Sequence, residues 1–128
     1  FDFIHGFNPG LIAFGANCGS GPAMLVDTLA ELCKAAHQND VVIAKGNCGL
    51  PQMVEGKLEY SGTKEVMVEY AKLARDCGAR IIGGCCGTTP KILAHVIEAM
   101  NDYLPGDAPR REKIEDILGP IKVPPAAT

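Results

Sequence analysis

The residues of this chain best suited to chemistry are cysteines that follow apolar segments. Six cysteines occur among the 128 residues, at positions 18, 33, 48, 77, 85 and 86. Cys18, Cys48 and the adjacent pair Cys85 and Cys86 each come after a short apolar run. Thiolates bind zinc tetrahedrally, and a catalytic zinc site keeps one of its four positions open. Cysteines clustered in this way indicate metal binding or catalysis.

Glycines surround the cysteine pair, in the string Gly-Gly-Cys-Cys-Gly over residues 83–87. Adjacent side chains diverge, so Cys85 and Cys86 reach one ion only where the backbone turns sharply, which glycine permits. A helix predicted to start near Pro90 would favour their thiolate forms through its partial positive charge. Cys18, also followed by glycine, would complete a three-sulfur site. A substrate thiol would suit the fourth position, because zinc lets a thiol ionise near neutral pH.

Other interpretations of these cysteines stay open at this point. A vicinal pair such as Cys85 and Cys86 can also form a strained disulfide or simply pack. Cys48 is a small loop residue, a spare ligand or a redox partner. Cys33 and Cys77 fall at core-facing positions of predicted helices, where we expect them to act as small hydrophobic residues. We expect no ligand role for the three histidines.

Three apolar segments are predicted to be the strands that position these cysteines. They span residues 11–16, 41–45 and 79–82, and helical patterns follow near residues 22–36, 64–77 and 91–101. Strands that alternate with helices through short connections predict a parallel sheet. The active site of such folds lies at the carboxyl ends of the strands, where we therefore expect the cysteines. The one longer connection, residues 46–62, is predicted to be a loop.

The α/β units leave two architectures open, a closed eight-fold barrel and an open doubly wound sheet. A barrel takes about 250 residues, so three units cannot close one. The chain is therefore a fragment, a subunit of an assembly of several copies, or an open sheet. Its first residue is Phe1, from which we expect that an upstream part has been removed.

The last part of the chain differs from these units. Residues 105–128 hold five of the nine prolines, so we expect a tail without a core of its own. Only residues 112–118 have a helical pattern, with Ile114, Ile117 and Leu118 as an apolar anchor. The tail is expected to pack as an arm on the preceding units or on a partner subunit.

Composition narrows the classes of function. Apolar residues make up 47% and charged residues 21% of the chain, and the net charge is −3, as in ordinary globular proteins. No basic run marks a nucleic-acid surface, and no apolar stretch approaches the roughly 20 residues of a membrane span. A regular α/β pattern is not typical of small disulfide-rich secreted proteins, so we expect reduced thiols in a cytoplasmic protein.

Three strings of residues resemble the homocysteine S-methyltransferase family. They are Gly-Ala-Asn-Cys at residues 15–18, Asn-Cys-Gly-Leu-Pro at 47–51 and Gly-Gly-Cys-Cys-Gly-Thr-Thr-Pro at 83–90. The resemblance covers about residues 9–101, and the third string is the most specific. It implies a TIM (β/α)8 barrel whose sixth to eighth units lie within residues 1–104, with residues 105–128 as an extended tail.

The resemblance also implies an activity and a site. Zinc would be held by Cys18, Cys85 and Cys86, and a methyl group would be transferred to the thiol of homocysteine to form methionine. Asn17 would contribute to substrate binding, whereas Cys48 is not an expected ligand, because many family members have alanine there. The first five units, which grip the amino acid in the family, are absent from this sequence.

Several points stay open beside this interpretation. The methyl donor could be betaine, S-methylmethionine, a folate, a corrinoid or another methylated compound. The macromolecular partner is expected to be the remainder of the barrel or a second copy of the chain, and neither nucleic acid nor membrane. The alternative functions are a non-catalytic zinc-binding fragment and a redox protein that uses Cys85 and Cys86.

Overall fold

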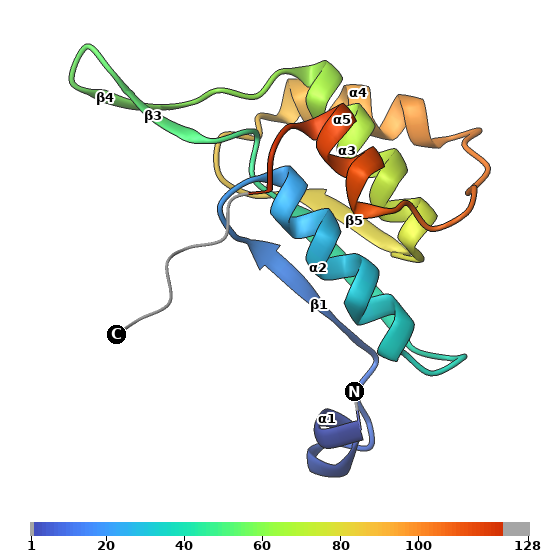
Figure 1. The fold of residues 1–128 in the computed structure, drawn as a ribbon. Coiled ribbons are helices and arrows are strands. Elements are labelled where there is room, and N and C mark those ends of the chain that lie inside the picture. Colours follow the sequence, from blue (N-terminus) through green and yellow to red (C-terminus); the bar gives the residue numbers. More distant parts are fainter. Residues whose placement is uncertain (1, 122–128) are drawn as a thin grey trace.

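A three-stranded parallel sheet forms the centre of the molecule (Figure 1). The computed structural model describes residues 2–121, apart from the side chain of Cys18. The strands are β1 (Ala13–Cys18), β2 (Val41–Gly46) and β5 (Ile81–Gly84), in the order β1-β2-β5. Because both pairings are parallel, the three carboxyl ends lie at one edge, as predicted.

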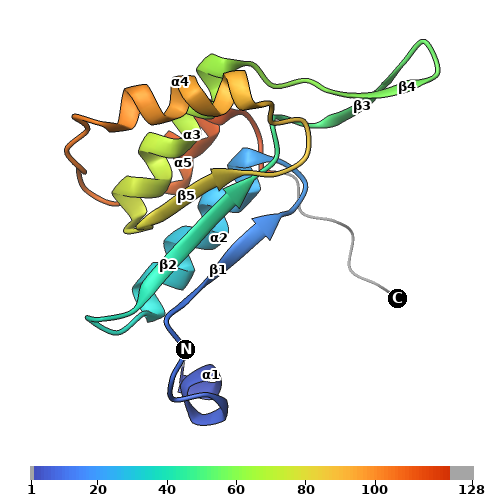
Figure 2. The same cartoon turned by 180° about the vertical axis from the view of Figure 1, so that it is seen from behind.

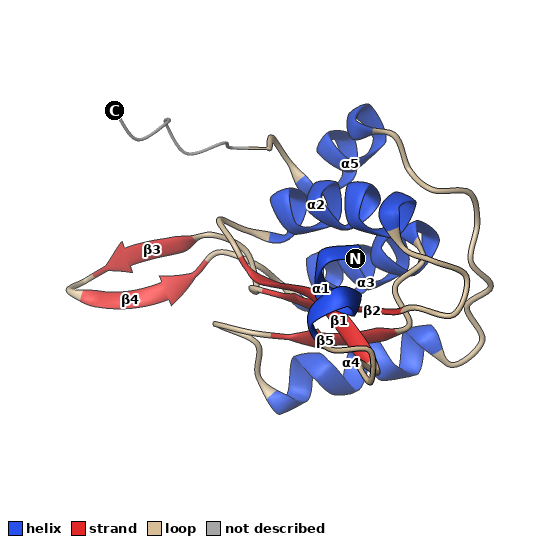
Figure 3. Ribbon diagram, turned by 90° about the horizontal axis from the view of Figure 1, so that it is seen from below, coloured by secondary structure: helices blue, strands red, loops and turns tan. Residues whose placement is uncertain are grey.

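Helices pack on one face of this sheet. The helices on the sheet itself are α2 (Pro22–Ala35) and α3 (Lys64–Cys77). Helices α4 (Pro90–Met100) and α5 (Arg111–Leu118) pack on these helices, and α1 (Asp2–Phe7) precedes β1. Helix α3 packs between α2 and α4, and α5 packs against α2 and α3. Figure 3 shows α2 and α5 on the same side of the strands. In the view of Figure 2, no helix of the described residues lies in front of β1 and β2.

Side-chain alternation in β2 explains why one face is covered. Val42 and Ala44 are buried beneath the helices, whereas Lys45 between Ala44 and Gly46 is exposed. Successive side chains of a strand point to opposite faces, so Lys45 lies on the face that the helices leave bare. The core between sheet and helices is built around large buried side chains such as Leu29 and Tyr70.

The predicted helix ends are confirmed. Thr63 Oγ1 accepts a hydrogen bond from the backbone N–H of Val66 at 3.3 Å, and Thr89 Oγ1 accepts one from that of Ile92 at 3.2 Å. Helix α3 stops at Gly78, whose φ of 121° is accessible to glycine because it has no Cβ. Of the helices in residues 2–121, none is long and apolar enough to cross a bilayer.

Two strands start later than predicted. Strand β1 begins at Ala13 and not at residue 11, and β5 begins at Ile81 and not at residue 79. Their pairing with β2 sets these limits, because the first register pairs are Ala13 with Val41 and Ile81 with Ile43. Apolar runs therefore located the strands but not their ends, which depend on backbone partners. Cys18 is the last residue of a strand and not a loop residue.

The predicted loop over residues 46–62 is wrong in part, because it contains a β-hairpin. Strands β3 (Pro51–Val54) and β4 (Lys57–Tyr60) pair antiparallel and extend away from the body (Figure 1). Glu55 and Gly56 form its turn with positive φ values of 50° and 79°. A positive φ at both central residues is the geometry of a type I′ turn, which matches the twist of paired strands.

The first residues and the tail also take regular structure. His5 Nε2 lies 2.6 Å from Asp40 Oδ1, and His37 Nε2 lies 2.7 Å from Asp2 Oδ1, so these pairs hold α1 against the α2–β2 connection. Sequence reasoning assigned no element to this segment. The helix expected over residues 112–118 is present as α5, and its Ile114 is fully buried in the common core.

Candidate functional site

The carboxyl ends of β1, β2 and β5 bring the predicted ligand segments to one edge. Cys18, Gly46 and Gly84 are register partners across the three strands, and Cys85 follows at once. Neighbouring strands lie about 4.8 Å apart, so the backbones at Cys18 and Gly84 are separated by roughly 10 Å. The side chain of Cys18 lies outside the part of the chain that the structure describes, so Cys18 is placed by its backbone alone.

Cys85 and Cys86 lie in a tight turn between β5 and α4. Their Sγ atoms are 3.9 Å apart, which is too long for a disulfide bond. The N–H of Cys85 donates to the carbonyl of Gly46 at 2.7 Å, and the N–H of Thr88 donates to the carbonyl of Cys85 at 3.1 Å. Gly87 has a φ of 78°, which provides the sharp turn that sequence reasoning expected from glycine.

Asn47 connects this turn to the end of β1. Its side chain is 5% exposed, so its polar atoms need partners within the protein. Asn47 Nδ2 donates to the carbonyl of Gly19 at 3.1 Å, and Asn47 Oδ1 accepts from the N–H of Cys86 at 3.2 Å. The carboxamide therefore fixes the loop after Cys18 relative to the loop that holds Cys86.

Sequence reasoning found the string at residues 47–51 but not this bridging role of Asn47. Residues 47 and 86 are separated by 39 positions, and no local pattern reports so distant a hydrogen bond. The available signal was weaker: a polar residue directly after a buried strand, at the edge where loops converge.

The other cysteines with described side chains are buried in or against the core. Cys48 is 1% exposed and Cys77 is 8% exposed, while Cys33 packs against the core. Burial raises the pKa of Cys33 and of Cys48, and it raises the pKa of Cys77 to about 12. Neutral thiols are poor metal ligands. The prediction that Cys33 and Cys77 act as small hydrophobic residues is confirmed, and Cys48 is likewise a packed residue.

Comparison with known proteins decides the family. The model of the homocysteine S-methyltransferase family matches residues 3–100, which is more than half of the chain. The chain belongs to the homocysteine S-methyltransferase family. It is 33% identical over 105 residues to methionine synthase of Mycobacterium leprae, and 33% identical over 92 residues to that of Mycobacterium tuberculosis. These matches cover 81% and 71% of the chain but 8% of each relative.

The distance between the sulfur atoms of Cys85 and Cys86 fits two ligands of one zinc ion. Sulfur atoms at two corners of a tetrahedron with 2.3 Å zinc–sulfur bonds lie about 3.8 Å apart. The Sγ atoms of Cys85 and Cys86 are 3.9 Å apart. Among the side chains that the structure describes, no three His, Cys, Asp or Glu residues gather as a metal site. The third predicted ligand, Cys18, is not among those side chains.

The remaining predicted site residue, Asn17, is exposed on β1 one position before Cys18. Its register partner is Lys45, on the adjacent strand. A Cβ atom built on Gly83, the partner of Lys45 on β5, would meet no atom within 4 Å. The bare face of the sheet is therefore open at Gly83, two strands away from Asn17, and the substrate-binding role of Asn17 stays a prediction.

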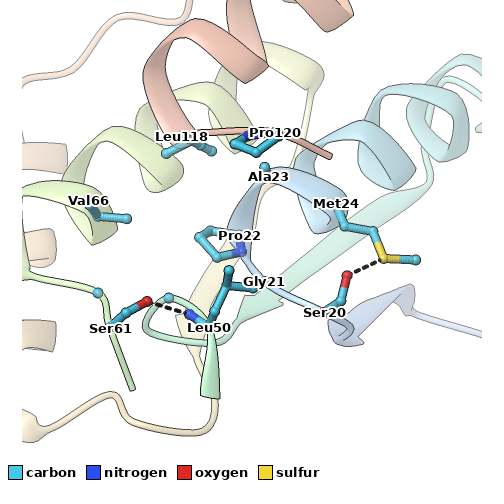
Figure 4. A pocket seen from close by; sticks show the side chains of 12 residues that line it. Ser20, Gly21, Pro22, Ala23, Met24, Leu50, Ser61, Val66, Leu118 and Pro120 are labelled. Carbon is cyan, nitrogen blue, oxygen red and sulfur yellow. Dashed lines mark hydrogen bonds between the residues drawn. The ribbon is translucent and has the colours of Figure 1, made fainter. Parts of the chain in front are cut away.

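A small cavity near this edge is separate from the cysteine pair (Figure 4). Its volume is about 140 Å³, and its lining comes from the starts of α2 and α3, the two ends of the hairpin segment and the end of α5. Leu50, Val66 and Leu118 give it an apolar wall, and no cysteine lines it. This cavity is not part of the candidate thiolate site.

Proposed function

We propose that this chain supplies the zinc-binding part of an enzyme that transfers a methyl group to the thiol of homocysteine and so forms methionine. The observation that carries the proposal is the placement of Cys85 and Cys86 at the strand edge that also ends at Cys18, in a member of the homocysteine S-methyltransferase family. The chain spans 8% of the length of the methionine synthases it matches, so the activity belongs to a larger assembly.

We propose Cys18, Cys85 and Cys86 as the three protein ligands of zinc. What zinc supplies in such a site is charge withdrawal from a substrate thiol, so that the thiol ionises near neutral pH and stays nucleophilic. Two asparagines of the chain have the remaining roles in this proposal, which are to hold the ligand loops and to contact the substrate. The hydrogen bonds of Asn47 hold the two ligand loops together, and Asn17 contacts the amino acid from the adjacent bare face.

The proposed architecture is a TIM (β/α)8 barrel, in which β1, β2 and β5 are the sixth to eighth strands. Support comes from the parallel order β1-β2-β5 and from the helices of the described residues, which cover one face of the sheet. In a barrel the second face of the sheet turns inward, and neither β1 nor β5 is left as an edge. Residues 1–104 would then be barrel and residues 105–128 a tail, and a reduced, cytoplasmic location suits the thiolate site.

The partners in this proposal are the small-molecule substrates and the protein that completes the sheet. The methyl donor stays open among betaine, S-methylmethionine, folates and corrinoids. The rest of the barrel or a second copy would cover the two strand edges, because unpaired edges associate readily. Sedimentation velocity separates these cases: a chain that stays monomeric at high concentration would contradict pairing between copies.

The substrate assignment can be tested with Co²⁺ in place of zinc, because cobalt reports its ligands through its absorption spectrum. We expect homocysteine to add a sulfur-to-cobalt charge-transfer band to the loaded chain, since its thiol takes the open position. Homoserine, which carries oxygen in place of that sulfur, is the matched control and should add no band. The same spectrum with both amino acids would contradict the proposal. Cys86→Ser should abolish the response and Cys33→Ser should keep it.

A further inference from the structure

Tyr70 reaches the strand ends from the middle of α3. It is fully buried and is the largest fully buried side chain in the described residues. Its ring lies against Gly46, the last residue of β2: a Cβ atom built on Gly46 would be 3.0 Å from Tyr70 Cε2 and from Cζ. The space that the ring occupies therefore exists because residue 46 has no side chain.

The hydroxyl of Tyr70 lies between β2 and β5 at the level of the cysteine pair. It accepts a hydrogen bond from the N–H of Gly46 at 3.0 Å and donates one to the carbonyl of Gly83 at 3.1 Å. Gly46 is the register partner of Gly84, and its carbonyl accepts from the N–H of Cys85 at 2.7 Å. In a parallel ladder of this register, the N–H of Gly46 faces the carbonyl of Gly83. The hydroxyl thus bridges two groups that the pairing of Gly46 with Gly84 also brings together.

This bridge requires a neutral phenol. The hydroxyl donates its single proton in the hydrogen bond to the carbonyl of Gly83. A lone pair of its oxygen accepts the hydrogen bond from the N–H of Gly46. Burial raises the pKa of Tyr70, so the hydroxyl keeps its proton at neutral pH. The neutral phenol that both hydrogen bonds require is therefore the form present at neutral pH.

We propose that Tyr70 is a positioning residue for the thiolate site, acting through the backbone of Gly46 and Gly83. By bridging these two residues, the hydroxyl sets the separation of β2 and β5 immediately before Asn47 on one strand and Cys85 on the other. This inference rests on the proposed zinc-dependent function. Groups behind the ligands of a metal site commonly change metal affinity by about 10- to 100-fold when they are removed.

The test replaces Tyr70 by Phe, which keeps the ring and removes the bridging oxygen. Tyr103→Phe is the matched control, because the hydroxyl of Tyr103 also makes a hydrogen bond, to Asp76 Oδ1 at 2.8 Å, in the last turn of α3. We expect Tyr70→Phe to weaken zinc binding by about ten-fold or more and to shift the ligand-field bands of the Co²⁺-loaded chain. We expect Tyr103→Phe to match the parent in both measurements, because it removes a hydroxyl away from the strand ends.

A purely structural role would lower thermal stability in both variants but leave the cobalt spectrum unchanged, and that result overturns the inference. A parent chain that binds no zinc refutes the proposed function instead. The positioning role is then judged by amide hydrogen exchange at residues 84–86 and by the alkylation rate of Cys85 and Cys86. Both rates should rise in Tyr70→Phe and not in Tyr103→Phe; equal rates in the parent and Tyr70→Phe overturn it.

Discussion

At the scale of single residues, burial divides the cysteines with described side chains into packing groups and candidate metal ligands. Cys33, Cys48 and Cys77 lie in or against the core, and burial raises the pKa of each, so they stay protonated and act as packing groups. Cys85 and Cys86 lie nearer the surface, in the turn after β5. This division explains why a chain rich in cysteine would use only part of its thiols for metal binding.

Part of this site could be predicted from sequence because its signals are local. Glycines beside Cys85 and Cys86, and a capped helix that follows them, occupy one continuous stretch. The roles of Asn47 and Tyr70 could not be predicted in this way. Tyr70 bonds to the backbone 24 residues before it and 13 residues after it, and Asn47 bonds 39 residues ahead. Such contacts exist only once the sheet has formed.

Replacing Asn47 by Ala tests whether its carboxamide joins the two ligand loops. The change leaves the N–H of Cys86 and the carbonyl of Gly19 without their partner, so we expect a loss of about 1–3 kcal/mol in the free energy of unfolding. Urea denaturation of the reduced, metal-free chain measures this. Asn8→Ala is the control, because Asn8 Oδ1 bonds only the exposed N–H of Gly10 among the described contacts. Equal losses in both variants would refute the bridging role.

At the scale of elements, the strands and helix ends follow from sequence more closely than the connections do. Apolar runs locate β1, β2 and β5, and threonine and glycine mark the helix ends. The hairpin β3–β4 has mostly exposed side chains, so no apolar alternation reveals it. Its turn at Glu55 and Gly56 gives only a weak local signal. The tail is expected to lack a core of its own and to pack on the preceding units, and α5 does so by sharing the core of α2 and α3.

The contribution of α5 can be measured with two substitutions in one helix. Ile114 is fully buried, so Ile114→Ala should lower the free energy of unfolding by about 2–5 kcal/mol through lost packing and a residual cavity. Ile117 is 38% exposed, and Ile117→Ala should cost clearly less. Thermal unfolding of both variants under reducing conditions gives the comparison. A smaller loss for Ile114→Ala than for Ile117→Ala would show that α5 is not anchored as described.

At the scale of the whole molecule, the topology of the sheet brings the residues of the proposed site together. The parallel order β1-β2-β5 brings residues 18, 47 and 85 from three distant parts of the sequence to one edge, where Asn47 and Tyr70 add cross-strand bonds. Among the described residues, the same topology leaves one sheet face and the outer edges of β1 and β5 without a covering element. A zinc site built from this chain and a substrate pocket completed by another segment are consistent with its match to a small part of methionine synthase.

The most direct test is the zinc content of the freshly purified, reduced chain, measured by atomic absorption beside Cys85→Ser and Cys33→Ser. We expect about one zinc per chain in the parent and in Cys33→Ser, because a buried neutral thiol is no ligand. We expect little zinc in Cys85→Ser, since a serine hydroxyl replaces a thiolate ligand poorly. Full zinc in Cys85→Ser, or no zinc in the parent, would contradict the claim that this chain holds the metal through the pair at the end of β5.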